Sequence, residues 1–221
     1  MNVLKRIALG TAAMAFVAAP LTAASAQASH GTSQKNWAQK KQCRVIDRQQ
    51  QYLIDRFDFH NKGQLNRFQQ LVNRENKLNC ATNVTSFDYL KRFGNFESLV
   101  AALEYTNLDD ALNGPGTFTV FAPTDNAFAK LPPALVQGLL TDPAQKPALE
   151  NILKYHVIAG AAVPSTTAVT LTEATMLNGE KVQIKVQNGK LFLNDSQVVI
   201  KDVKTSNGVI HVIDTVLVPT S

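Results

Sequence analysis

The last third of the chain alternates apolar and polar residues, and this pattern constrains the fold more than any other feature. Val182, Ile184 and Val186 alternate with polar residues, and Asn188-Gly189 then separates this run from Leu191-Phe192-Leu193. A period of two is the spacing of a half-buried β-strand, and Asn-Gly favours a tight hairpin turn. The segment therefore predicts an antiparallel hairpin, which needs further elements to cover its apolar face.

Helical patterns precede this β-rich end. Apolar residues recur at helical spacing between Phe87 and Leu112, and Asn113-Gly114-Pro115-Gly116 predicts a turn after them. Further helices are predicted at 125–131, 133–140 and 148–154, and strands at 118–121, 198–200 and 209–218. Helices first and mostly antiparallel strands later predict the α+β class.

The N-terminus has the three parts of a secretory signal peptide. Lys5 and Arg6 precede an uncharged apolar run from Ile7 to Ala19, and small residues with A-x-A cleavage patterns follow up to Ala28. The apolar run is shorter than a membrane-spanning helix. We predict a signal peptide at residues 1–28 and an exported, periplasmic or extracellular protein; an uncleaved N-terminal anchor is the alternative.

Residues 29–82 predict a helical hairpin closed by a disulfide. One helical stripe runs from Trp37 to Phe57 and a second from Leu65 to Leu78, with Asn61 and Gly63 marking the loop between them. At 1.5 Å per residue, Cys43 and Cys80 fall about 22 and 24 Å from the loop, at the open end of the hairpin. Because an exported chain meets an oxidising compartment, we predict a Cys43–Cys80 disulfide.

Positive charge is concentrated in this extension. Residues 29–92 contain 12 Lys and Arg against 5 Asp and Glu, whereas residues 93–221 contain 8 against 12. A basic face attracts anionic surfaces, polysaccharide or nucleic acid, and it also occurs as an ordinary solvated surface. Both interpretations remain open at this stage.

Three segments together resemble the fasciclin domain family. They are Thr119–Phe128 (TVFAPTDNAF), the pair Tyr155-His156, and Asn207–Asp214 (NGVIHVID) followed by Val216–Pro219. Their order and spacing resemble the family from about residue 84 to Pro219. The resemblance implies that residues 83–221 form a fasciclin-like β-sandwich wedge with several short helices, preceded by the α-helical hairpin.

The resemblance also carries functional expectations. The family is known for adhesion and for matrix or cell-surface interaction, with no catalytic activity, and some members bind carotenoids. In the family, the Tyr-His pair and its aliphatic neighbours have been linked to receptor binding. The resemblance therefore implies partner binding by Tyr155, His156, Val157 and Ile158. A histidine in an apolar run is also commonly a hydrogen-bonded core residue, which is the competing interpretation of His156.

The sequence carries none of the common catalytic motifs. The sequence lacks a G-x-S-x-G elbow, an H-E-x-x-H zinc motif and a phosphate-binding loop. The three residues His156, His211 and Asp214 could meet at a metal only if their segments adjoin, and no local spacing orders them. We therefore expect no catalytic residue, no metal and no cofactor.

The sequence thus predicts a secreted, non-enzymatic interaction or adhesion module. Its partner is expected to be a cell-surface or matrix protein or polysaccharide, with anionic-surface contact through the basic hairpin, and neither nucleic acid binding nor a membrane span is expected. The alternative function is a carrier of an apolar small molecule such as a carotenoid, which would need an apolar cleft.

Overall fold

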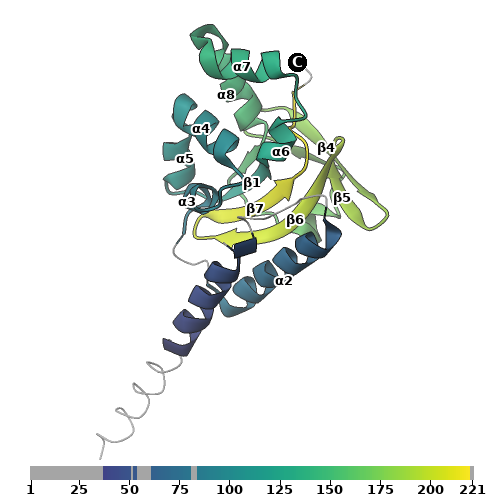
Figure 1. Cartoon of the computed structure of the whole chain (residues 1–221). Helices are drawn as coiled ribbons and strands as arrows, with labels where there is room; N and C mark the ends of the chain where they lie inside the picture. Colours follow the sequence, from purple (N-terminus) through teal and green to yellow (C-terminus); the bar gives the residue numbers. More distant parts are fainter. Residues whose placement is uncertain (1–36, 51, 54–60, 81–83, 220–221) are drawn as a thin grey trace, which may run out of the picture. The chain divides into compact units, whose positions relative to one another are not determined.

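The computed structural model describes residues 37–50, 52–53, 61–80 and 84–219 (Figure 1). The predicted signal peptide at 1–28 lies outside these residues. Within the described part of the chain, no helix is long and apolar enough to cross a membrane. The architecture combines short helices with a seven-stranded sheet, which confirms the predicted α+β class.

The predicted helical hairpin is present. Residues 37–50 and 52–53 are helical, and α2 (Lys62–Leu78) follows. It begins inside the predicted loop because Asn61 caps it, with Oδ1 accepting from the N–H groups of Gly63 and Gln64. The predicted Cys43–Cys80 disulfide is confirmed, with the two Cα atoms 5.5 Å apart.

The helical region predicted at 87–112 is three helices rather than one. It divides into α3 (Ser86–Arg92), α4 (Glu97–Thr106) and α5 (Asp109–Asn113). The Asp125 carboxylate starts α4 by accepting from the N–H groups of Glu97 and Ser98 at 3.2 and 2.8 Å, and Asn107 ends it with a left-handed φ of 60°. The later helices are α6 (Asp125–Phe128), α7 (Pro133–Thr141), η1 (Pro143–Gln145), α8 (Lys146–Lys154) and α9 (Ser165–Ala168).

The seven strands form one sheet in the order β2-β1-β7-β6-β5-β4-β3. Only the β1–β7 pair is parallel among the described strands. The Leu177 N–H donates to the Val157 carbonyl at 2.7 Å, so the chain beyond β3 reaches β2 and the sheet nearly closes. The strands are β1 (Phe118–Pro123), β2 (Val157–Ala159), β3 (Glu173–Thr175), β4 (Lys181–Gln187), β5 (Lys190–Leu193), β6 (Ser196–Thr205) and β7 (Gly208–Ile213).

Two strand predictions had different outcomes. The β4–β5 hairpin is confirmed, and its turn residues Asn188 and Gly189 have φ angles of 52° and 74°, as a tight primed turn requires. The strand predicted at 209–218 instead ends at Ile213. Beyond it, the N–H groups of Thr215 and Leu217 bind the side chains of Ser196 and His156 rather than a neighbouring strand.

Apolar clusters cover the two faces of the sheet. On one face, helices α3, α4 and α8 pack against β1, β6 and β7; on the other, residues of β4, β5 and β6 enclose a second cluster around Phe121. Strands β1 and β7 are buried on both faces, so FTVFAP and GVIHVI lack the alternation seen in β4. This central parallel pair carries two of the three segments that resemble the fasciclin family.

Helix α2 of the basic extension packs against β6 (Figure 1). The Gln69 side chain pairs with the backbone of Lys201, donating to its carbonyl and accepting from its N–H, both at 2.9 Å. About two turns later, Asn76 donates to the Asp202 carbonyl at 2.5 Å. Since β5 pairs with β6 only near Ser196 and Gln197, α2 covers an edge that would otherwise be open.

This edge contact gives a first prediction. Gln69→Ala removes both side-chain bonds to Lys201 and is expected to lower the free energy of unfolding by about 1–2 kcal/mol. Gln70→Ala, on the exposed side of the same helix, is the control and is expected to change stability by less than about 0.5 kcal/mol. Urea unfolding measures both. Equal behaviour of the two variants would contradict the role assigned to Gln69.

Candidate functional site

The segment beginning at Asn207 is a structural junction. Its side-chain oxygen accepts from the Ser86 N–H at 2.8 Å, and its amide nitrogen donates to the Leu112 carbonyl at 2.5 Å. Its own carbonyl accepts from the Phe118 N–H at 2.9 Å. One asparagine therefore joins α3, α5 and β1 to the β6–β7 turn, which accounts for its place in the recognisable segment.

The second recognisable residue, His156, is also used internally. Its Nδ1 donates to the Ile152 carbonyl at 2.7 Å and its Nε2 accepts from the Leu217 N–H at 2.9 Å. These two bonds require the neutral Nδ1–H tautomer and tie the end of α8 to the C-terminal segment. Burial lowers the pKa of His156 to about 4, while the Ile152 carbonyl acts in the opposite direction.

The lowered pKa of His156 gives a second prediction. The unfolded chain protonates His156 near pH 6.5, whereas the folded chain protonates it only near pH 4. The contribution of His156 to the free energy of unfolding is therefore complete above pH 6.5 and falls as the pH is lowered from 6.5 to 4. The difference corresponds to about 3 kcal/mol. His156→Gln is expected to reduce the change in unfolding free energy between pH 7 and pH 4 by about that amount. A wild-type imidazole that titrates near pH 6.5 by NMR would contradict the assignment.

The four residues for which partner binding was predicted lie largely in the interior. Tyr155 is 2% exposed, and its hydroxyl donates to the Lys181 carbonyl at 2.9 Å and accepts from Asn194 at 3.2 Å. His156 and Val157 are buried, and Ile158 is half-buried. A partner would reach the first three only after the surrounding structure opened, so this binding role stays a prediction.

A serine, an aspartate and a histidine come together near β6, but not with the geometry of a catalytic triad. Ser165 donates from its hydroxyl to the Asp202 carboxylate. His211 Nδ1 accepts from the Asp202 backbone N–H at 3.3 Å, and its Nε2 donates to the Val163 carbonyl at 2.9 Å. The imidazole thus has no nitrogen aimed at the serine and cannot activate it.

Metal-ligating side chains do not gather in the described part of the chain. No group of three His, Cys, Asp or Glu suited to a metal occurs among those residues. Both ring nitrogens of His156 and of His211 bind backbone groups instead. The side chain of Asp214 is bonded to Gln197 and Thr215. The hypothetical His156, His211 and Asp214 ligand set is therefore not assembled.

An apolar pocket lies between α7, α8 and the C-terminal segment. Its lining includes Leu135, Leu139, Ile152 and Val218, and its volume is about 20 Å³. Sites for drug-sized ligands usually occupy about 300–1,000 Å³. In this conformation the pocket is too small for a carotenoid or a comparable apolar molecule.

A larger groove lies between α2 and the sheet, and four lysines line it. These are Lys62 of α2, Lys130 after α6, Lys190 of β5 and Lys201 of β6, and we call the hollow the lysine groove. Its volume is about 520 Å³, and Asp214 is the only acidic residue among the described residues of its lining. Because the lysines come from separate elements, no local motif in the sequence marked it. The basic charge of the extension pointed only to Lys62 among the four.

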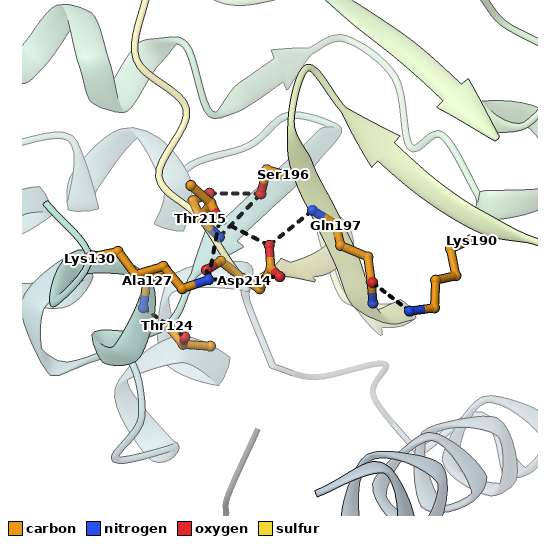
Figure 2. Close-up of polar contacts among 8 residues, drawn as sticks. All are labelled: Thr124, Ala127, Lys130, Lys190, Ser196, Gln197, Asp214 and Thr215. Carbon is orange, nitrogen blue, oxygen red and sulfur yellow. Dashed lines mark hydrogen bonds and ion pairs between the residues drawn. The ribbon is translucent and has the colours of Figure 1, made fainter. Parts of the chain in front are cut away.

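Hydrogen bonds hold two of these lysines at the rim (Figure 2). Lys130 Nζ donates to the Asp214 carbonyl at 2.6 Å and lies 3.8 Å from its carboxylate. Lys190 Nζ donates to the Gln197 side chain at 2.9 Å. The Asp214 carboxylate accepts in turn from the Gln197 N–H at 2.9 Å. The wall between the two lysines is therefore a connected polar network.

Comparison with known proteins places the fold. The Fasciclin domain family model matches residues 94–219. Protein sll1483 of Synechocystis sp. is 46% identical over 124 residues, which are 56% of this chain and 67% of that protein. Cell surface glycolipoprotein MPB83 of Mycobacterium bovis is 44% identical over 113 residues, 51% of this chain and 48% of that protein.

A solved structure agrees with the sequence comparisons. It is the structure of a FAS1 domain pair from the insect cell adhesion molecule Fasciclin I. The two folds are similar with a TM-score of 0.56 and 20% sequence identity, and the match covers 62% of this chain and 51% of that chain. At this identity the likeness concerns the fold alone. The family match begins at residue 94, so α2 and the groove residue Lys62 lie outside the matched region.

Proposed function

Because this chain belongs to the fasciclin domain family, we propose that it is an exported, non-enzymatic interaction module that binds a cell-surface or matrix partner. The lysine groove is the observation that carries this proposal. The four lysines that line it are exposed to solvent, and its volume is large enough for a ligand. The predicted signal peptide at 1–28 and the Cys43–Cys80 disulfide support export to the periplasm or the exterior.

The relatives support an interaction role at the cell surface. One of them carries the name of a cell-surface glycolipoprotein. The histidines of the described domain support a non-enzymatic role, because His156 and His211 bind backbone groups and are not presented to a substrate. The recognisable family segments thus build the scaffold, and we assign binding to its surface.

Chemical crosslinking and pull-down from the native envelope and medium test this proposal. The purified protein is expected to capture a saturable partner that a basic exported protein of equal net charge does not capture. Competition by excess untagged protein checks saturation. Recovery of the same material by both proteins would overturn the proposal.

The carrier function remains the second candidate and has weaker support. The apolar pocket of about 20 Å³ would have to widen greatly to hold a pigment. A visible absorption band in protein purified from its native host would favour a carrier, whereas a colourless native protein would count against it.

A further inference from the structure

We propose that the lysine groove binds a segment of an acidic polysaccharide, one that bears carboxylate or sulfate groups on its sugars. This inference rests on the proposed interaction function and names its ligand class. Three of the four lysines, Lys130, Lys190 and Lys201, belong to the region 93–221, where acidic residues outnumber basic ones by 12 to 8. These three lysines therefore make the groove locally positive within a region whose net charge is negative.

Asp214, the one acidic residue among the described lining residues, does not neutralise this charge. The Asp214 carboxylate accepts from the Gln197 N–H at 2.9 Å and from the Thr215 hydroxyl at 3.1 Å, and of the four lysines only Lys130 lies within ion-pair distance. Lys62 and Lys201 have no carboxylate within ion-pair distance in the described part of the chain. The groove therefore presents a net positive field, strengthened by its concave wall.

The remaining polar lining suits sugar hydroxyls. Asn66 of α2 and Asn126 of α6 present exposed side-chain amides to the groove, each able to donate and to accept. Amides between lysines match a chain whose hydroxyls alternate with anionic groups. A volume of about 520 Å³ accommodates a short oligosaccharide segment rather than a single small anion.

Other anionic occupants fit less well. No aromatic side chain occurs among the described residues that line the groove, so within that part of the chain unpaired nucleic acid bases would lack the stacking surface on which they are usually held. A bilayer surface would meet protruding basic side chains, whereas these lysines border a hollow. Both occupants are outcomes of the test below.

The groove exists because the extension packs on the domain. Lys62 and Asn66 lie on α2, which is fixed to β6 through the Gln69 bonds to Lys201. A fasciclin domain without this extension would lack that wall. The family fold thus supplies the sheet side of the site, and the extension, which lies outside the residues matched by the family model, supplies the other side.

Two triple variants of equal charge test the proposal. Lys62→Gln, Lys190→Gln and Lys201→Gln together remove groove charge but leave Lys130, which holds Asp214. The control changes three exposed lysines outside the lining, Lys77, Lys185 and Lys204, to Gln. Binding of a polyuronate hexamer, of dextran sulfate and of a neutral maltohexaose is measured by calorimetry at low and at moderate salt. Single-stranded DNA and anionic phospholipid vesicles are titrated under the same conditions.

The groove variant is expected to bind the polyuronate or the dextran sulfate at least about tenfold more weakly than wild type, and the control by less than about threefold. Salt should weaken wild-type binding more than that of the groove variant. Equal losses in both variants, equal binding of maltohexaose, or tighter binding of single-stranded DNA or of anionic phospholipid vesicles would overturn the proposal. Capture of an envelope partner without polysaccharide binding would overturn it while leaving the interaction function in place.

Discussion

Replacing Gly208 with alanine is expected to lower the free energy of unfolding by more than about 4 kcal/mol, or to prevent folding. Gly208 opens β7 and lies opposite Phe118 in the parallel β1–β7 pair. A Cβ at this position would sit 1.9 Å from the Phe118 carbonyl oxygen and 2.8 Å from its carbonyl carbon. The clash is with the backbone of Phe118, which cannot rotate away as a side chain can. Strands β1 and β7 would therefore have to separate.

Two further glycine variants isolate the cause of this loss. Gly189 has a φ of 74° with open space around it, so Gly189→Ala tests backbone conformation alone and is expected to cost about 1 kcal/mol. Gly138 lies within α7, where an added Cβ meets open space, so Gly138→Ala is expected to stabilise by about 0.5–1 kcal/mol. Thermal and urea unfolding compare the three. A Gly208→Ala protein as stable as Gly189→Ala would contradict the close-approach argument.

The β4–β5 hairpin shows how much of the fold local patterns could predict. Its alternation and its Asn188-Gly189 turn depend on neighbours within a few residues, so the sequence predicts it directly. The three helices between Ser86 and Asn113 could not be separated in the same way. The first turn of α4 is held by Asp125, which lies 28 residues from Glu97 in sequence, and periodicity does not report such a distant cap.

The candidate site escaped prediction for a related reason. The recognisable segments pointed to Tyr155 and His156, but hydrogen bonds to Lys181, Ile152 and Leu217 tie these residues into the interior. Single lysines at the ends of unrelated elements have no sequence pattern, and they become a site only through the packing of α2 on β6. Net charge by region indicated the α2 side of that surface and not the sheet side, because residues 93–221 contain more acidic than basic residues.

Loss of the Cys43–Cys80 disulfide is expected to lower the free energy of unfolding by about 4 kcal/mol. The bridge closes a loop across a separation of 37 residues, and in the chain-entropy model a loop of this length contributes about that amount. The Cys43→Ala, Cys80→Ala double variant avoids free thiols, and its urea transition is compared with that of the oxidised wild type. Reduced wild type serves as the control and should unfold with the double variant.

The expected size of this effect depends on the extension and the domain unfolding together. Ile46 of the first helix is 1% exposed, and Phe68 and Val72 of α2 belong to the same apolar cluster as residues of α3, α4 and β6. The Gln69 bonds to Lys201 add a polar contact across the same boundary. Because side chains of the hairpin and of the domain bury one another at this boundary, loosening the hairpin should expose core residues of the domain. If the main unfolding transition of the double variant loses less than about 1 kcal/mol of unfolding free energy, the hairpin unfolds separately from the domain. The wall that Lys62 supplies to the lysine groove would then be the first part of the site to be lost.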